Sequence, residues 1–550
     1  SYGGESLDKK TPLLRSMNAI NKQGLRILRL FGNTTVHSIV TTVGPEQEYF
    51  LIDRDVFDKR RDLIYTGRTL LGARPPKGQE MDDHYFGAIK PRIAAFMKEL
   101  DEELWKLGIL AKTEHNEVAP GQHELAPIFT TTNIATDHNQ LTMELMKRVA
   151  ARHGMVCLLH EKPFDGVNGS GKHNNWSLST DTGVNLLEPG QSPYDNAQFL
   201  LFLCAVIKAV DEYQDLLRIS ASGAGNDHRL GAHEAPPAVV SVSLGDELTE
   251  ILESIESNTA YDAKEKVQMR VGVHVLPRFP KDTTDRNRTS PFAFTGNKFE
   301  FRMLGSAASI ASANIILNTA VAEELSQFAD VLEAADDFQS ALDTLIKKTI
   351  KEHKRIIFNG NGYNDEWIAE AERRGLLNLR TTPDCLPRYE EPKNIALFTK
   401  HKVFSPAEIH SRMEIAYENY SKTIHIEALT MLDMVCKEII PSVSSYIHEL
   451  TQTALSKKQL MPNIDCYTEE TLITKLNDLS NQLYRYMEQL QAAMDKVSAI
   501  TDVAETAQYY CHTVLDVMQK LRSVADELEL YTDKRWWPYP SYGEILFSVR

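Results

Sequence analysis

The apolar and polar residues of the first 310 positions follow the periods of strands in some stretches and of helices in others. The stretch TTVGPEQEYFLI at 41–52 has the period of two of a strand, which sets Glu46 and Glu48 on one face and Gln47, Tyr49 and Leu51 on the other. Other patterns predict helices at 11–31, 83–107, 133–153 and 194–218, a hairpin at 111–132, and strands at 155–160, 236–244, 270–277 and 297–304. Residues 53–83 are predicted to be mostly loop because glycine and proline recur there. The region is therefore mixed α and β.

The composition shifts near Ser312, and from there to the C-terminus the pattern predicts mainly helices. The clearest helix spans 468–497, where apolar residues recur at spacings of four and three: Leu472, Leu476, Leu479, Leu483, Tyr486, Leu490, Met494 and Val497. Such a stripe is typical of packing between antiparallel helices rather than of a cofactor site. Asp502 and Glu505 predict a capping box for a further helix that ends near Leu530. We therefore expect a mixed domain at 1–335 and a mainly helical one at 336–550.

Composition and charge narrow the class of protein. The 550 residues include 76 acidic and 60 basic side chains, for a net charge of −16, which disfavours nucleic acid as a partner. Six cysteines without CxxC spacing predict reduced thiols and a cytoplasmic location. No apolar run approaches the roughly 20 residues of a membrane helix, and the N-terminus has no signal-peptide pattern. A folded cytoplasmic protein without a membrane partner is expected.

Two pairs of carboxylates stand out in this pattern. Glu46 and Glu48 share one face of a strand that is otherwise apolar, so they repel each other and lose hydration unless a cation or a proton neutralises them. In HNEVAPGQHELAP, Pro120 and Gly121 suit the centre of a type II turn, and a hairpin closed there sets Glu117 directly opposite Glu124. Opposed like charges destabilise a sheet, so this pair also favours a metal. The alternative is two solvated glutamates on an exposed hairpin.

The glycine-rich stretch GVNGSGKHNNWSLST carries a further candidate ligand. Residues 166–172 fit the GxxxxGK part of a phosphate-binding loop, but His173 replaces the required Ser or Thr and no helix follows. Residues 173–179 instead alternate as a strand, with His173, Asn175, Ser177 and Ser179 on one face and Trp176 and Leu178 on the other. NGSG would then be a loop whose backbone approaches a ligand closely. His173 is a candidate metal ligand, although a single histidine is more often structural.

Basic residues occur in two loops and on one further strand. Loop 225–237 carries Arg229 and Glu234 and has the polar, glycine-bearing composition of a mobile catalytic loop. Arg286 and Arg288 lie in loop 280–291, where a guanidinium suits a carboxylate or phosphoryl oxygen, although charged loops are often only solvated.

In NKFEFRML at 297–304, the alternation sets Phe299, Phe301 and Met303 toward a core and Lys298, Glu300 and Arg302 on the opposite face. A carboxylate between two cations is either metal-bound or part of a salt-bridged outer face. Together, five glutamates and a histidine favour two or more Mg²⁺ or Mn²⁺ ions over a structural zinc. Paired metals with nearby arginines suit phosphoryl transfer from ATP.

In this order the motifs resemble those of glutamine synthetase. The family's successive site motifs have similar counterparts in this sequence: EQE at 46–48, NEVAPGQHE at 116–124, NGSGKH at 168–173, EAPP at 234–237, RNR at 286–288 and KFEFR at 298–302. The long helical tail and the ending WWPYPSYGEILFSV resemble the type III branch. The resemblance implies an α+β catalytic domain with a curved antiparallel sheet flanked by helices, followed by a mainly helical C-terminal region.

The resemblance also implies roles for individual residues. A first metal would be bound by Glu48, Glu117 and Glu124, and a second, between the ATP phosphates, by Glu46, His173 and Glu300. Glutamate would be held by Asn168, Gly169, Arg229 and Arg302, and the nucleotide by Ser177, Asn175 and Lys298. Arg288 would neutralise the transferred phosphate, and Glu234 would close over the site and accept a proton from the attacking nitrogen.

The activity implied is ATP-dependent ligation of ammonia to the γ-carboxylate of glutamate through γ-glutamyl phosphate, with two or three Mg²⁺ or Mn²⁺ ions per site. The implied assembly is a dodecamer of two hexameric rings. One alternative is a ligase of the same fold that uses another amine, such as a polyamine, and another is a non-catalytic scaffold relative. The presence of all six expected metal ligands disfavours the scaffold.

This sequence departs from the family pattern at several points. Asn175 stands in place of a second histidine, and Ala293 in place of an arginine, whose role would pass to Lys298. The chain begins where the family's catalytic domain begins. The small N-terminal β-grasp domain, which in the family completes the neighbouring subunit's site, is therefore expected to be missing.

Overall fold

The computed structural model describes residues 4–259, 261, 268–269, 279–280 and 287–549. The predicted strand at 270–277 and the candidate Arg286 lie outside the described residues. None of the described helices combines the length and apolar character needed to cross a membrane.

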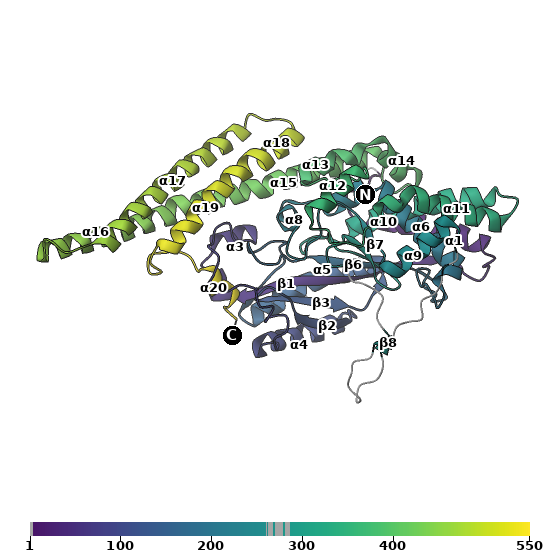
Figure 1. The fold of residues 1–550 in the computed structure, drawn as a ribbon, viewed down its shortest axis with the longest axis horizontal. Coiled ribbons are helices and arrows are strands. Elements are labelled where there is room, and N and C mark those ends of the chain that lie inside the picture. The colour runs from purple at the N-terminus through teal and green to yellow at the C-terminus, as the bar shows by residue number, and fades with distance from the viewer. Residues whose placement is uncertain (1–3, 260, 262–267, 270–278, 281–286, 550) are drawn as a thin grey trace.

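A nine-stranded sheet forms the centre of the first part of the chain (Figure 1), in the order β2-β3-β1-β6-β11-β10-β7, with β4 and β5 also paired to β1. Its strands are β1 (Ile39–Asp53), β2 (Ala111–Asn116), β3 (Gln122–Pro127), β4 (Thr130–Thr131), β5 (Met155–Leu158), β6 (Lys172–Thr180), β7 (Val242–Ser243), β10 (Phe292–Phe294) and β11 (Phe299–Phe301). All pairings are antiparallel except β7 with β10. A separate two-stranded sheet joins β8 (Gln268–Met269) and β9 (Phe279–Pro280). The predicted α+β fold is confirmed.

Strand β1 organises the sheet because it is long and pairs on both edges. It contacts β3 and β5 over its C-terminal half and β6 over most of its length. The predicted alternation of its side chains is confirmed: Gln47 and Tyr49 are fully buried on one face, and Glu46 and Glu48 share the other. The face carrying Glu46 and Glu48 is the one that receives polar residues from the neighbouring strands.

Helices cover the face opposite these glutamates. They are α1 (Lys10–Leu30), α4 (Pro91–Lys106), α5 (Thr132–Arg152), α6 (Ala197–Glu212), α7 (Gln214–Ser220) and α10 (Ala311–Glu333). Helices α4 and α5 bury Tyr49 and Leu51 of β1 in one apolar cluster. The indole nitrogen of Trp176 on β6 donates to the side chain of Asn318 on α10 over 2.9 Å. Because the helices occupy this face, the opposite face is left for chemistry.

Smaller helices connect these elements: α2 (Arg54–Phe57), α3 (Arg61–Thr66), η1 (Pro193–Asp195), α8 (Ala224–Arg229), α9 (Asp246–Ser257), α11 (Phe338–His353), η2 (Lys354–Ile356), α12 (Asp365–Arg373), α13 (Thr382–Cys385), η3 (Leu386–Glu390) and α14 (Pro392–Lys400). Together with the long helices that follow, α11 to α14 confirm a mainly helical second part.

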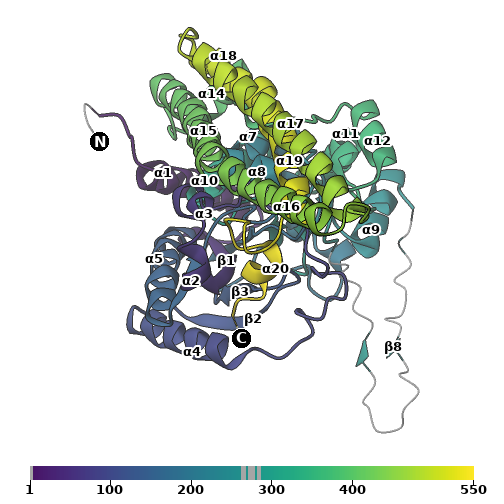
Figure 2. The ribbon, with the colours of Figure 1, turned by 90° about the vertical axis from the view of Figure 1, so that its left-hand side faces the viewer.

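The long helices of the second part are α15 (Pro406–Met434), α16 (Ile440–Leu460), α17 (Tyr467–Val497), α18 (Val503–Tyr509) and α19 (Leu515–Tyr531), with π-helical turns η4 (Val435–Ile439) and η5 (Tyr510–Val514). They lie along one side of the sheet-bearing part, and the hairpin of α16 and α17 projects beyond it (Figures 1 and 2). The predicted helix at 468–497 is confirmed, and Leu476, Leu483 and Leu490 of its stripe are fully buried. The short α20 (Tyr542–Leu546) returns to β1, which brings the C-terminus near α4 and β2.

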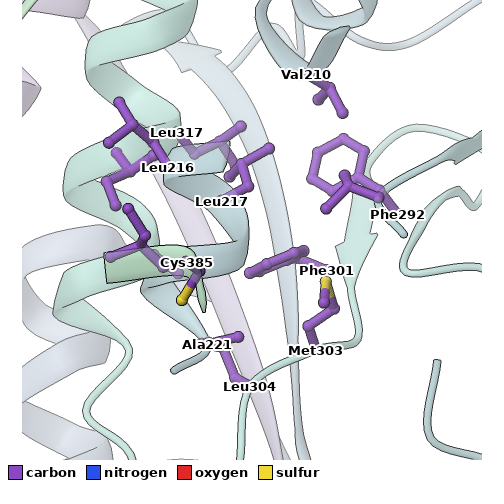
Figure 3. Packing of buried hydrophobic residues seen from close by; sticks show 14 of the residues in the cluster. Val210, Leu216, Leu217, Ala221, Phe292, Phe301, Met303, Leu304, Leu317 and Cys385 are labelled. Atoms are coloured by element: carbon purple, nitrogen blue, oxygen red, sulfur yellow. The ribbon is translucent and has the colours of Figure 1, made fainter. Parts of the chain in front are cut away.

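One apolar core joins the two parts. Phe292 and Phe301 from the sheet edge pack with Leu217 of α7 and with Cys385 of α13, and all of these are at most 1% exposed (Figure 3). The same cluster continues into α15, α17 and α19. The helical part is therefore packed against the sheet-bearing part rather than tethered to it.

Several predicted elements are shorter or broken. The helix expected at 83–107 begins at Pro91, because the residue before a proline disfavours helical backbone. The helix at 194–218 breaks at Tyr213, and the strand at 236–244 shrinks to β7. Loop 53–83 contains α2 and α3.

The helix predicted after 502 is interrupted by η5. Asp502 caps its first turn by accepting from the Glu505 backbone N–H over 2.8 Å.

Candidate metal and substrate site

The pairing of β1, β6 and β11 brings three predicted ligands together. Glu46 lies directly opposite His173, and Glu300 lies opposite Asn175 on the next strand. The Nδ1 atom of His173 is 3.1 Å from Oε2 of Glu46 and 3.0 Å from Oε1 of Glu300. Its Nε2 atom is 3.8 Å from Oε1 of Glu48. His173 therefore sits between two groups of carboxylates that could each hold a metal ion, one with Glu46 and Glu300 and one with Glu48 and Glu124.

The turn of the β2–β3 hairpin forms as predicted, but the predicted register is wrong. The Gln122 backbone N–H donates to the Ala119 carbonyl over 3.0 Å, and Gly121 has a φ of +75°, as a type II turn requires. Glu124, however, pairs with His115 and not with Glu117. Glu117 lies in the loop, where its backbone N–H donates to the Gln122 carbonyl over 2.9 Å. The loop of this hairpin is therefore longer than the tight turn that was predicted.

The wider loop still delivers both glutamates and adds a histidine. Since the register shifts by two residues, each side chain keeps its face. His115 lies with its Nδ1 atom 3.4 Å from Oε1 of Glu117 and its Nε2 atom 3.1 Å from Oε1 of Glu124. These three residues form a further group with metal-ligand spacing. His115 was not predicted from the sequence as a candidate ligand. It lies two residues before Glu117, so the alternation of a strand would have placed both side chains on the same face.

The electrostatics of this group of carboxylates, the acidic site, favour a cation. Burial, followed by the charges of Glu48 and Glu124, raises the pKa of Glu117. Burial likewise raises the pKa of Glu124. Burial and Arg302 act to lower the pKa of His173, but its hydrogen bonds to Glu300 and Glu46 outweigh them and raise it to about 10. Burial therefore makes the negative charges of Glu117 and Glu124 unfavourable, and a divalent cation would offset this cost. Carboxylate oxygens with imidazole are a donor set suited to Mg²⁺ or Mn²⁺.

Strand β11 contributes as its alternation predicted, with one exception. Phe299, Phe301 and Met303 are fully buried in the main core. On the other face, Arg302 Nη1 donates to Glu300 Oε1 over 2.8 Å. The exception is Lys298, for which no carboxylate lies within ion-pair distance among the residues that the structure describes.

The glycine-rich loop precedes a strand, as predicted, and its glycines serve packing inside the protein. A Cβ atom on Gly169 would lie 2.3 Å from the Glu161 carbonyl oxygen, and one on Gly171 would lie 2.1 Å from Nη2 of Arg229. Arg229 is 3% exposed. It donates to the backbone carbonyls of residues 302–304 at 3.2–3.3 Å. Arg229 therefore joins the glycine-rich loop to the end of β11. The resemblance had implied instead that Arg229 binds a carboxylate of glutamate.

Residues from three loops form hydrogen bonds around Glu234 and Asn168. Glu234 accepts from Asn168 Nδ2 over 3.2 Å and from Arg288 Nη1 over 3.1 Å. Asn168 is fixed by Gln79, whose amide donates to Asn168 Oδ1 over 2.9 Å and accepts from its backbone N–H over 2.8 Å. Gln79 lies in a stretch of sequence without a recognisable motif, so no signal identified it.

The two polar residues expected on the nucleotide side lie along β6. Asn175 donates to Glu46 Oε1 over 3.0 Å and to the Gly44 carbonyl over 3.1 Å. Farther along the strand, the Ser177 hydroxyl donates to the Asn297 carbonyl over 2.9 Å. These residues extend the polar face of β6 away from His173.

Comparison with known proteins identifies two matching family models. One described as glutamine synthetase, catalytic domain, matches residues 28–240, and one described as glutamine synthetase C-terminal domain matches residues 341–458.

Similar proteins share the full length of the chain. A glutamine synthetase of Butyrivibrio fibrisolvens is 51% identical over 553 residues, which cover 100% of this chain and 78% of that protein. The type-3 glutamine synthetase of Dictyostelium discoideum is 45% identical over 100% of this chain and 75% of its own length. A glutamine synthetase of Bacteroides fragilis is 42% identical over 100% of this chain and 76% of its own length.

Proposed function

The chain belongs to the glutamine synthetase family, and we propose that the acidic site on β1, β3, β6 and β11 is where it carries out the ligase reaction. The protein is a glutamate–ammonia ligase that forms glutamine with the consumption of ATP. The names of its relatives do not favour the amine-ligase or scaffold alternatives. The observation that carries the assignment to this site is the position of His173, within 3.1 Å of both Glu46 and Glu300 and beside Glu48.

Two groups of side chains fit divalent cations. Glu48, Glu117 and Glu124 would hold one ion: Glu124 has metal-ligand spacing with Glu48 and His173, and also with Glu117 and His115. Glu46, His173 and Glu300 would hold the other. Bound there, Mg²⁺ or Mn²⁺ would neutralise the phosphate charge that develops during phosphoryl transfer. The protein's contribution is to fix the ligands on paired strands, which keeps their separation constant.

The remaining residues would position the reactants. Asn175 and Ser177 continue along β6 from the second metal group, and with Lys298 they would contact the nucleotide. Asn168, Gly169 and Arg302 would contact the glutamate. Arg229 would contribute indirectly by holding the glycine-rich loop in place, because its guanidinium already donates to backbone carbonyls.

The loop that carries Glu234, within residues 225–237, would protect the intermediate from water. Transfer of the ATP γ-phosphoryl group to the γ-carboxylate of glutamate gives γ-glutamyl phosphate, which ammonia then attacks at the acyl carbon with release of phosphate. Glu234 would accept the proton lost by the attacking nitrogen, and Arg288, which forms an ion pair with it, would balance phosphoryl charge. His233 and Glu234 have φ angles of +52° and +66°. The contacts of Glu234 with Arg288 and Asn168 hold this left-handed backbone. Such a strained conformation is typical of a segment that rearranges between states.

The proposed assembly follows from the family. We propose a dodecamer of two hexameric rings, in which a neighbouring subunit would complete each site. Analytical ultracentrifugation tests the assembly independently of activity.

The decisive experiment replaces Glu300 by alanine in the full protein. We expect ammonium-dependent phosphate release from ATP and glutamate to fall by at least about a hundredfold, because phosphoryl transfer loses a ligand of the second metal group. Glu103→Ala on α4, where the carboxylate pairs only with surface cations, is the matched control and should retain activity. Titration with Mn²⁺ gives a second readout, in which Glu300→Ala should show one fewer tight site. Unchanged turnover and metal stoichiometry would refute the assignment.

A further inference from the structure

A short segment of the mainly helical second part, NGNGY at 359–363, lies between η2 and α12 and contacts the loops that carry Glu234 and Arg288. The Tyr363 hydroxyl donates a hydrogen bond to the carbonyl of Ala235 over 2.9 Å. Ala235 directly follows Glu234, so this hydrogen bond holds the backbone beside the Glu234 carboxylate. The 359–363 segment therefore reaches the loop that would protect the intermediate, although none of its residues was predicted as part of the site.

The same segment holds the loop of Arg288 through the residues on either side of that arginine. The Asn287 side-chain amide donates to two backbone carbonyls of the segment over 3.0 and 2.8 Å. The Gly362 backbone N–H donates to Oγ1 of Thr289 over 2.8 Å. A Cβ atom on Gly362 would lie 2.9 Å from the Thr289 carbonyl oxygen, so this close approach requires glycine. The backbone around Arg288 is therefore fixed by the 359–363 segment.

The segment is itself anchored to the sheet-bearing part and to α12. Oδ1 of Asn359 accepts from the backbone N–H groups of Leu244 and Gly245, directly after β7, over 3.0 and 3.1 Å. Phe358, directly before the segment, stacks on Trp367 of α12 with the ring centroids 3.7 Å apart. Because the 359–363 segment is held at both of these points, it can restrain the loops that it contacts.

Three charged residues assigned to the site act on the Tyr363 hydroxyl. Burial raises the pKa of Tyr363 to about 12, although the charges of Arg302 and Arg229 act to lower it; the charge of Glu234 acts to raise it. The phenol therefore keeps its proton at neutral pH and remains a donor to the Ala235 carbonyl. Tyr363 thus belongs to the surroundings of the site, although it comes from the second part of the chain.

We propose that Tyr363 is a positioning residue for the ligase reaction, because the 359–363 segment keeps the Glu234 and Arg288 loops in contact with each other. This role rests on the proposed function, in which the Glu234 loop protects γ-glutamyl phosphate from water. Glu234 accepts from Arg288 Nη1 over 3.1 Å and from Asn168 Nδ2 over 3.2 Å. Loss of the Tyr363 hydrogen bond would let this loop open more often. Water would then attack γ-glutamyl phosphate in place of ammonia and return glutamate and phosphate, so that ATP is consumed without formation of glutamine.

Glutamine and phosphate measured in the same reaction of the full protein, with ATP, glutamate, ammonium and Mg²⁺, test this role. Coupled ligation releases phosphate and glutamine in equal amounts, so phosphate in excess of glutamine reports hydrolysis of the intermediate. Tyr363→Phe removes only the hydroxyl, and the share of excess phosphate should rise about two- to tenfold, as expected for one lost hydrogen bond. Asn287→Ala releases the Arg288 loop and should shift this share in the same direction.

Tyr509→Phe is the matched control. The Tyr509 hydroxyl also donates to a backbone carbonyl, that of Ala493, over 3.2 Å, but it lies between α18 and α17 of the helical part. The control should therefore release as little excess phosphate as the unmodified protein. Partial unfolding of any variant would lower glutamine and phosphate together and leave their ratio unchanged, so the ratio reports positioning rather than stability.

Glu234→Ala separates the role of the segment from the proposed function. It should lower glutamine formation and raise the share of excess phosphate. If it does so while Tyr363→Phe and Asn287→Ala behave as the control does, the proposed function stands and the role of the 359–363 segment is refuted. If Glu234→Ala leaves both rates unchanged, the proposed role of Glu234 is wrong, and so is that of the segment. If either Tyr363→Phe or Asn287→Ala does not fold, the other variant decides.

Discussion

A buried ion pair between Arg68 and Glu427 joins the loop after α3 to helix α15. Nε and Nη2 of Arg68 each lie 2.8 Å from a separate oxygen of Glu427, a bidentate geometry that orients both groups. The two residues are 8% and 1% exposed. The Arg68 guanidinium overcomes the effect of burial and lowers the pKa of Glu427. We expect this contact to link the stability of the helical part to that of the catalytic part.

The two single substitutions should differ. Glu427→Met leaves a guanidinium that cannot lose its proton, so it should cost about 3–5 kcal/mol of unfolding free energy. Arg68→Met leaves a carboxyl group, which can take up a proton, and should cost less. The double variant should cost only about 0–2 kcal/mol, because no uncompensated charge remains in the core. The coupling energy of the cycle is then several kcal/mol.

Urea unfolding at pH 7 and one fixed protein concentration measures this cycle, because assembly makes apparent stability depend on concentration. Arg61→Met is the matched control. Arg61 also bridges to the helical part, at Asp433 and Glu438, but it is 46% exposed, so its loss should cost under about 1 kcal/mol. Strictly additive effects of the Arg68 and Glu427 substitutions, or a cost for Glu427→Met no greater than that of the control, would refute the reasoning.

Two further expectations concern stability elsewhere. Burial raises the pKa of Glu323, but hydrogen bonds from His401 and Lys400 outweigh it and lower the pKa to about 2, below the ordinary value of 4.5. This contribution is present above pH 4.5 and is lost as the pH falls toward 2, so Glu323→Gln should flatten the loss of unfolding free energy over that window; an unchanged slope would contradict the assignment. Leu217→Ala, at a site 1% exposed, should cost about 2–5 kcal/mol in urea unfolding. Leu460→Ala, at a site 83% exposed, should stay within about 0.5 kcal/mol, and equal effects of the two would refute the packing described.

Strand periodicity made much of the acidic site predictable. Glu46, Glu48, His173 and Glu300 share faces of their strands because side chains alternate along any extended backbone. This alternation does not depend on contacts with residues far away in sequence, so it is found on β1, β6 and β11 alike. The amphipathic stripe of α17 was predictable for the same reason, since its period is a property of the helix alone.

The sequence by itself therefore determined which residues share a face, which turn closes at Pro120 and Gly121, and which stretch forms the long helix α17. Only the tertiary structure decided the register that opposes Glu124 to His115, the use of Arg229 as a brace, and the contact of Gln79 with Asn168. The physical reason is the range of the interactions. Side-chain alternation and turn geometry act over a few neighbouring residues, whereas register and long-range hydrogen bonds depend on backbone groups far away in sequence.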